Sequence, residues 1–188
     1  MIGTLAFTPS WLRKGKKEKW PVYHLRPGDL LERDEFEAEM EGRHRAGEVM
    51  AFQMRDAAIE GISALVEGND GEALKDVIHA EFSGETLSPA EKARAAEVTD
   101  ILAEHWPDYR FLLEQQARRN RILPTLAFRR WCDGWERVKG ADGELLEFER
   151  GRLGEIPESV MVKLAPPELR IAGLEAYALQ YGRNQSKN

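Results

Sequence analysis

The chain contains 188 residues with 33 acidic and 27 basic side chains, a formal net charge of −6, and Cys132 as its single cysteine. This length is sufficient for one domain with a hydrophobic core that needs no metal or disulfide, and a lone cysteine excludes an intrachain disulfide. No stretch approaches the roughly 18 apolar residues of a membrane span, and the N-terminal apolar residues precede the charges rather than follow them, so we expect a soluble intracellular protein without a secretory signal.

Charge is distributed unevenly along the chain. Residues 1–28 carry six Lys or Arg and one acid, a net charge of +5, whereas residues 29–82 carry fifteen acids and five bases, a net charge of −10. Residues 83–188 are close to neutral, with seventeen acids and sixteen bases. A basic arm before an acidic helical layer can indicate intramolecular or head-to-tail attraction or a charged partner, and it can equally be a solvated loop next to a solvated helix face.

Two short segments near the N-terminus have the composition of β-strands. Residues 4–8 and 20–26 are rich in β-favouring residues, and the polar stretch between them is long enough to close an antiparallel hairpin. A two-stranded hairpin is marginal in water, so we expect it to pack on the helical body or to pair with another subunit. A Pro-Gly turn ends the second strand. Asp29 then lies three residues before Glu32, a capping-box arrangement that begins a helix.

The remaining sequence has helical periodicity in several segments separated by turn or proline signals. Ser88, Pro89 and Glu91 form the clearest helix start, with a serine cap, a proline in the first position and a closing glutamate. Pro124 is expected to interrupt or kink a later helix, because it has no N–H to donate. The helices predicted in this way span residues 29–41, 48–67, 72–82, 89–105, 107–135 (resuming after Pro124), 157–164 and 167–181, with a turn at residues 68–71 and loops at 84–87 and 140–154.

These elements predict a mainly α fold of the α+β class, with a small N-terminal β-hairpin followed by a multi-helix bundle. We divide the chain into an N-terminal hairpin arm with a basic loop at residues 1–28, a helical domain at residues 29–182 and a disordered polar tail at residues 183–188. The sequence shows no internal repeat and no low-complexity tract.

No catalytic or metal-binding signature stands out. His24, His44, His79 and His105 are far apart and lack the paired spacing of zinc ligands, so we expect no metal or other cofactor. Cys132 lies among large apolar residues and is expected in the core, although nearby arginines could activate a surface thiol. The absence of a P-loop, a nucleophile elbow and a dinucleotide fingerprint favours a protein that is not an enzyme.

Two basic and aromatic regions could bind a charged partner. Residues 11–20 place five cations between Trp11 and Trp20, and residues 118–137 carry six arginines among aromatic side chains. Such a pattern can bind nucleic acid through phosphates and stacked bases. It can also be a solvated loop and the charged end of a helix around a tryptophan core, and the acidic body disfavours a phosphate backbone. A nucleic-acid-binding protein that uses the 11–20 loop therefore stays an alternative.

The order of segments over residues 20–181 resembles the tail assembly chaperones of long-tailed bacteriophages. The resemblance rests on an extended segment that meets a capped acidic helix (PVYHLRPGDLLERDEFEAEM, residues 21–40), a tryptophan-rich segment (FRRWCDGW, residues 128–135) and a following proline-bounded helix (PESVMVKLAP, residues 157–166). It implies a non-enzymatic protein of the host cytoplasm that binds the tape measure protein, keeps it soluble, helps to recruit tail tube protein and is absent from the mature virion.

A chaperone of this kind needs apolar grooves between helices for its partner. The same aromatic and methionine side chains could instead be core residues, and the hairpin edges could support a homo-oligomer. A structural head–tail connector or neck protein of a virion is a further alternative. The candidate partner-binding residues are Trp11, Lys14, Lys16, Lys17, Trp20, Tyr23, Met50, Met54, Trp131 and Trp135.

Overall fold

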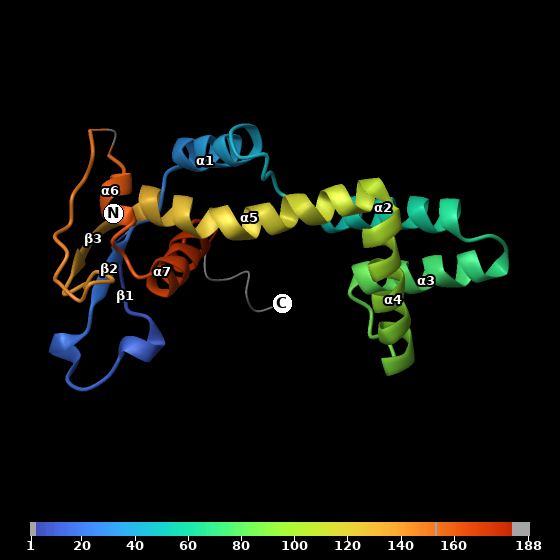
Figure 1. Cartoon of the computed structure of the whole chain (residues 1–188), viewed down its shortest axis with the longest axis horizontal. Coiled ribbons are helices and arrows are strands. Elements are labelled where there is room, and N and C mark those ends of the chain that lie inside the picture. The colour runs from blue at the N-terminus through green and yellow to red at the C-terminus, as the bar shows by residue number, and fades with distance from the viewer. Residues whose placement is uncertain (1–2, 153, 182–188) are drawn as a thin grey trace. The chain divides into compact units, whose positions relative to one another are not determined.

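The computed structural model describes residues 3–152 and 154–181 (Figure 1). A short N-terminal hairpin is followed by helices, so the predicted mainly α fold with a small β component is confirmed. The strands are β1 (Leu5–Phe7), β2 (Val22–Leu25) and β3 (Cys132–Glu136), and two 3-10 turns, η1 (Ser10–Leu12) and η2 (Lys17–Lys19), lie between β1 and β2. The α-helices are α1 (Leu30–Gly42), α2 (Ala51–Leu65), α3 (Asn69–Ser83), α4 (Pro89–His105), α5 (Pro107–Trp131), α6 (Glu158–Met161) and α7 (Pro166–Ala178).

The chain divides into two compact units. Unit 1 combines Met1–His44 with Asn120–Asn188, and unit 2 is the intervening segment Arg45–Arg119. The N-terminal hairpin therefore groups with the last third of the chain, at boundaries other than those predicted at residues 28 and 182. Helix α5 contributes residues to both units. The predicted tail at residues 183–188 lies outside the described residues.

The sheet of unit 1 is antiparallel with the strand order β1-β2-β3. β1 and β2 form the predicted hairpin, in which Ala6 is opposite His24. The third strand corrects the sequence-based prediction, which extended a helix through residues 132–135. β3 pairs with β2 so that Tyr23 is opposite Trp135, and the register shifts between His24 and Leu25. Because side chains alternate along a strand, Tyr23 and Leu25 share one face of the sheet, where both are fully buried.

Aromatic side chains fill the core of unit 1. The Trp131 ring lies on Phe36 of α1 with 4.7 Å between the ring centroids. Phe128 meets Tyr23 edge-on at 5.6 Å and stacks on Trp135 at 6.3 Å. Such offset and edge-to-face contacts add to the free energy gained from burying the rings. The end of α5, the sheet and α1 are thus joined by one aromatic cluster.

Helix α7 packs against α5 at the position of Pro124. A Cβ atom added at Gly173 would lie 1.9 Å from the Pro124 carbonyl oxygen and 2.6 Å from its carbonyl carbon. Of the two outcomes predicted at Pro124, an interruption or a kink, the interruption does not occur, since α5 continues to its end at Trp131. A proline inside a helix removes one backbone hydrogen bond. The close packing of α7, whose Ala172 and Ala176 are fully buried, offsets that loss.

Unit 2 is built from α2, α3, α4 and the first part of α5. Its core is apolar and is formed by Met54, Ala57, Ala58, Ile62, Ile78, Val98, Leu102 and Tyr109.

The predicted capping box of α4 is confirmed, because the Ser88 Oγ accepts from the Glu91 N–H at 3.3 Å and a Glu91 carboxylate oxygen accepts from the Ser88 N–H at 2.8 Å. The turn predicted at residues 68–71 is shorter than expected. Gly68, with a φ of +78°, makes the turn, and α3 begins at the next residue, Asn69.

The two ends of the unit 2 segment are joined by hydrogen bonds from α5. Arg119 is buried and its Nη1 donates to the Ala46 carbonyl oxygen at 3.2 Å, while Arg118 Nη1 donates to the Arg45 carbonyl oxygen at 3.3 Å. The charges of Arg118 and Arg119 are thus used in part to satisfy backbone carbonyls before α2 begins.

Candidate functional site

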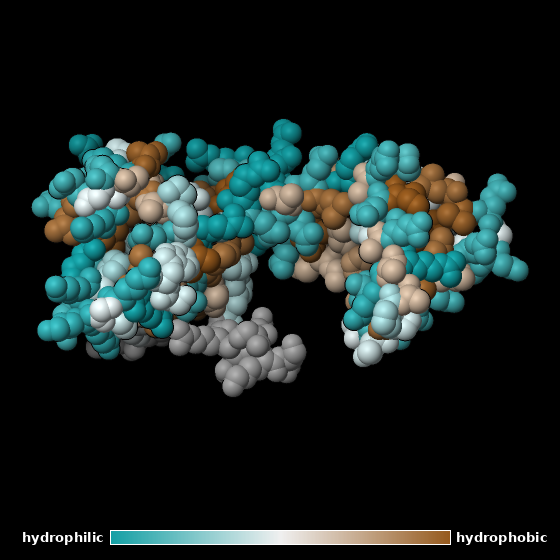
Figure 2. Space-filling view, turned by 60° about the horizontal axis from the view of Figure 1, so that its bottom comes forward, coloured by the Kyte–Doolittle hydropathy of each residue, from teal (hydrophilic) through white to brown (hydrophobic). Residues whose placement is uncertain are grey.

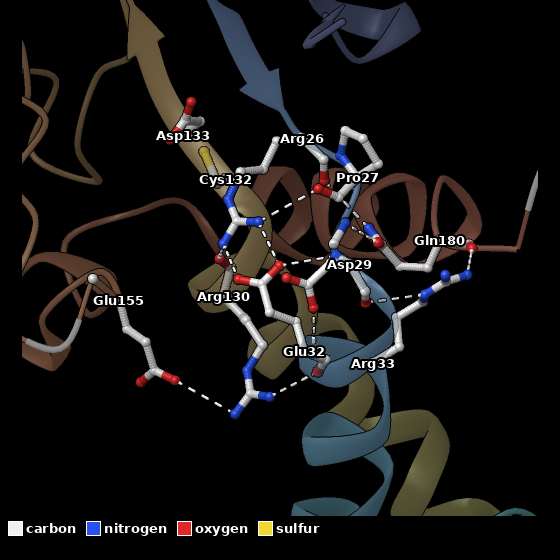
Figure 3. Close-up of polar contacts among 12 residues, drawn as sticks. Arg26, Pro27, Asp29, Glu32, Arg33, Arg130, Cys132, Asp133, Glu155 and Gln180 are labelled. Atoms are coloured by element: carbon white, nitrogen blue, oxygen red, sulfur yellow. Dashed lines mark hydrogen bonds and ion pairs between the residues drawn. The ribbon is translucent and has the colours of Figure 1, made fainter. Parts of the chain in front are cut away.

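Charged side chains gather where β2 meets α1 (Figure 3). Arg26 donates two hydrogen bonds to the Glu32 carboxylate, at 2.7 Å from Nη1 and 2.6 Å from Nη2. Glu32 also closes the capping box of α1, since its Oε2 accepts from the Asp29 N–H at 3.1 Å and its own N–H donates to Asp29 Oδ1 at 2.8 Å. The predicted capping box is confirmed, and Glu32 fastens the start of the helix to the end of the strand.

Two further elements of unit 1 reach the same cluster (Figure 3). From α5, Arg130 Nη1 donates to the Glu32 backbone oxygen at 3.1 Å and its Nη2 lies 3.0 Å from Glu39 Oε2. After α7, Gln180 Oε1 accepts from the Gly28 N–H at 2.5 Å. Gly28 has no room for a side chain, because an added Cβ would lie 2.6 Å from the indole nitrogen of Trp131. The cluster therefore holds four parts of unit 1 together.

The balance of charges in this cluster fits a structural role. The adjoining cleft has a volume of about 320 Å³ and is lined by Arg26, Glu32, Glu35, Arg130, Arg150, Gly154 and Glu155. Three cations and three carboxylates leave little net charge to attract an ion or an ionic ligand.

The hydrogen bonds from Arg26 lower the pKa of Glu32 below its ordinary value of 4.5. Burial raises the pKa of the neighbouring Cys132 thiol to about 12, so the thiol stays protonated near neutral pH.

Glu32→Gln is expected to lower the free energy of unfolding by about 1–2 kcal/mol near pH 7, because it removes a charge-assisted pair from a partly buried site. The pKa of Glu32 is lower in the folded than in the unfolded chain. Its contribution is therefore present above the unfolded-state pKa and is lost as the pH falls through the folded-state pKa. Urea unfolding from about pH 7 to about pH 3 should show the variant and the unsubstituted protein converging in stability at low pH.

The exposed Asp34 of the same helix, which does not line this cleft, provides the control for that experiment. Asp34→Asn should change the free energy of unfolding by less than about 0.5 kcal/mol at every pH, as is usual for an exposed position. A deficit of Glu32→Gln that stayed constant with pH would contradict the role assigned to the ion pair between Arg26 and Glu32.

Four of the predicted partner-binding residues lie in the cores of the two units. Tyr23 and Trp131 are fully buried, and Trp135 is 8% and Met54 6% exposed. The Tyr23 hydroxyl donates to Glu168 Oε2 at 2.6 Å, and burial together with this hydrogen bond raises the pKa of Tyr23. The Trp135 indole N–H donates to a backbone oxygen at 2.8 Å. These four side chains hold the fold together and present no surface to a partner.

The other predicted residues lie at the surface, in two separate places. Met50 is 44% exposed at the start of α2 in unit 2. The basic connector between β1 and β2 carries the rest, of which Trp11 is exposed and Trp20 is partly buried. The exposed lysines of the set are Lys14, Lys16 and Lys17. The structure thus places the basic residues, Trp11 and Trp20 in one connector, and it leaves the tryptophan-rich segment at residues 128–135 inside the core.

The basic connector and the sheet enclose a cleft of about 570 Å³, here called the hairpin groove. It is lined by Ala6, Thr8, Arg13, Lys17, Glu18, Trp20, Val22 and Arg137. Three of these side chains are cations and one is an acid, so the groove favours an anionic group.

A second candidate surface, the α2–α4 groove, lies in unit 2. It is a shallow apolar depression of about 40 Å³ lined by Ile62, Leu65, Val66, Leu74, Val98, Ile101 and Leu102. Leu65 of α2 and Ile101 of α4 are each 46% exposed beside it. Figure 2 shows hydrophobic surface over this part of the chain, on the right of the view, among hydrophilic residues. An exposed pair of branched apolar side chains next to an apolar depression can accept an apolar side chain from a partner.

The helices that form this groove are strongly acidic. Ala51–His105 contains twelve acids and four bases, a net charge of −8. The sequence does not distinguish Leu65 and Ile101 as surface residues, because apolar positions on one face of a helix have the same spacing whether that face is covered or open.

Comparison with protein-family models, with curated proteins and with solved structures finds no match to this chain. Within residues 3–152 and 154–181, no group of three or more His, Cys, Asp or Glu side chains could hold a metal ion. None of the helices in the described part of the chain is both long and apolar enough to cross a membrane. The hairpin groove and the α2–α4 groove are therefore the candidate binding surfaces.

Proposed function

We propose that the chain is a non-enzymatic tail assembly chaperone of the host cytoplasm, which binds the tape measure protein, keeps it soluble and promotes tail tube assembly. The observation that carries the proposal is the α2–α4 groove, an apolar depression left open to solvent on an acidic helical unit. A chaperone has to offer apolar surface to an aggregation-prone chain while staying soluble itself, and charge around an apolar groove meets both needs.

The groove geometry suits an amphipathic helix as the bound segment. Leu65 and Ile101 belong to two different helices, α2 and α4, and both border the same depression. A helix laid on such a seam would insert apolar side chains spaced three and four residues apart. The net charge of −8 on Ala51–His105 would attract basic residues on the flanks of that helix and repel a nucleic acid or an anionic membrane.

The segments that carry the family resemblance lie elsewhere, in unit 1. Residues 21–40 form β2 and α1, and residues 128–135 form the end of α5 and most of β3. They supply Phe36, Trp131 and Trp135 to the aromatic core. The resemblance therefore supports a common scaffold, whereas the open apolar surface proposed to bind the partner belongs to unit 2.

Ile101→Asp, combined with Leu65→Asp, is expected to abolish binding of the tape measure protein, because it places two carboxylates where apolar side chains would dock. The full chain would be co-expressed with the tape measure protein encoded in the same genome, and soluble complex would be measured by affinity capture. Both positions are 46% exposed, so the variant should keep its fold, which circular dichroism would check.

Leu31→Asp is the matched control, since Leu31 is 71% exposed on α1 in unit 1. It should leave the complex intact. A tape measure protein that stays insoluble and unbound with the unsubstituted chain would refute the chaperone proposal. A complex that survives the double substitution would refute the α2–α4 groove as the binding surface, and it would leave the chaperone proposal standing. Detection of the chain in purified virions by mass spectrometry would favour the connector alternative.

A further inference from the structure

The basic connector between β1 and β2 is folded rather than loose. Thr8 Oγ1 donates to the Pro21 carbonyl oxygen at 2.8 Å, which closes the connector at its base. Arg13 Nε donates to the Thr8 carbonyl oxygen at 3.0 Å, and the Trp20 indole N–H donates to the Lys14 carbonyl oxygen at 3.1 Å. Two 3-10 turns complete the connector. The backbone of the connector is therefore tied to itself at several points, while its lysine side chains are exposed to solvent.

Most of the charge held there has no counter-charge in the described residues. The side chains of Lys14, Lys16, Lys17 and Lys19 form no hydrogen bond or ion pair with residues 3–152 or 154–181. Arg13 uses only its Nε, so both of its terminal nitrogens are available. Holding like charges together in a folded segment costs free energy, and an anionic partner would remove that cost.

The hairpin groove lies on the face of the sheet that is turned away from the core. Val22 lines the groove and precedes the buried Tyr23, so the two side chains point to opposite faces of β2. Ala6 of β1 also lines the groove and is exposed. β1 is an edge strand, since its described partner is β2 alone. An edge strand offers unpaired backbone N–H and C=O groups to an added strand.

We propose that the hairpin groove binds an extended acidic peptide segment of a partner protein, which adds a strand beside β1 and points every second side chain toward Arg13 and Lys17. Side chains of an added strand alternate between the two faces, so acids at alternate positions would lie on the same face as Ala6. Their carboxylates would then meet the unpaired cations of the groove.

A peptide fits this groove better than a polynucleotide does. Glu18 lines the groove, and the charge of Arg137 is partly balanced by its ion pair with Glu136 at 2.7 Å. A polynucleotide carries a phosphate at every unit and would meet the Glu18 carboxylate. A peptide can place a neutral residue next to it. Only a peptide can also pair its backbone with the edge of β1.

The test uses the full chain and fluorescence anisotropy in about 50 mM salt, where exposed charges are weakly screened. The probes are labelled peptides of about ten residues, alternating Glu with Thr or Lys with Thr, and a single-stranded oligothymidine of about the same length. The Glu-Thr peptide is expected to bind at least about tenfold more tightly than either other probe. A single charge-assisted hydrogen bond is sufficient for a difference in affinity of this size.

Three variants separate the groove from general charge attraction. Lys17→Glu should weaken binding of the Glu-Thr peptide by about tenfold or more. Ala6→Trp fills the groove at an exposed position without changing the net charge and should weaken binding to a similar extent. Lys92→Glu changes the net charge by the same amount as Lys17→Glu, at an exposed position of α4, and should change affinity by less than about twofold.

Two results would overturn the proposal. Tighter binding of oligothymidine than of the Glu-Thr peptide would make the groove a nucleic-acid site. An equal effect of Lys17→Glu and Lys92→Glu, with none from Ala6→Trp, would show that only the overall charge of the chain matters. Neither result bears on the α2–α4 groove, which is tested by its own substitutions.

Discussion

Gly173→Ala is expected to lower the free energy of unfolding by about 3 kcal/mol or more, at the upper end of the range for overpacked cores. The added methyl group would lie 1.9 Å from the Pro124 carbonyl oxygen, 2.6 Å from its carbonyl carbon and 2.9 Å from its Cα. All three are backbone atoms, so no side-chain rotation can relieve the clash, and α7 would have to move away from α5. Urea unfolding followed by circular dichroism would measure the loss.

Gly42→Ala is the matched control for this substitution. Gly42 ends α1 and is exposed, and apart from its chain neighbours and the backbone of its own helix no described heavy atom lies within 4 Å of the position that its Cβ would occupy. The change should be neutral or should stabilise the protein by up to about 1 kcal/mol, because alanine is the better helix former. Equal stability of Gly173→Ala and the unsubstituted protein would mean that α7 does not pack on α5 at Pro124.

Trp131→Ala is expected to cost about 4 kcal/mol, the scale of removing a large aromatic side chain from a core. Trp131 is fully buried, and its ring packs on Phe36 with 4.7 Å between centroids. The indole also lies against Gly28, at the turn between β2 and α1. Its loss would therefore open a cavity where the strand, α1 and α5 meet. Thermal unfolding should show a fall in Tm of many degrees.

Trp11→Ala is the control for Trp131→Ala, because it makes the same substitution at an exposed position. Trp11 is 42% exposed in the basic connector, so its removal should change the free energy of unfolding by less than about 1 kcal/mol. If Trp131 were a partner-binding residue held at the surface in solution, the two tryptophan substitutions would have similar effects on stability. That outcome would contradict the aromatic core described for unit 1.

Local signals in the sequence identified most helices, and a long-range pairing was the main omission. The capping boxes at Asp29 and Ser88 depend on residues three positions apart, so the sequence alone is sufficient to place them. β3 has no such signal, since CDGWE contains two acids, a glycine and no regular alternation. It becomes a strand because its backbone pairs with β2, as in the pairing of His24 with Gly134.

The candidate site was predicted less well, for a physical reason. Tryptophan, tyrosine and methionine suit a core and a partner-binding surface equally, and composition does not distinguish the two. Burial assigned Tyr23, Met54, Trp131 and Trp135 to the core. Lysine side chains are almost always exposed, so the basic connector was correctly expected at the surface. The conformation of the connector depends on hydrogen bonds from side chains to backbone oxygens, and no sequence pattern predicts these.

The hydrogen bonds from Arg118 and Arg119 to the carbonyl oxygens of Arg45 and Ala46 mean that the chain enters and leaves unit 2 at one place. The two ends of the inserted segment therefore stay close together, whatever the length of the helices between them. Insertions of this form can be lengthened, trimmed or exchanged without disturbing the host fold. If the α2–α4 groove binds a helix as proposed, variation in Arg45–Arg119 would change which helix is bound while the sheet and its aromatic core remain the same.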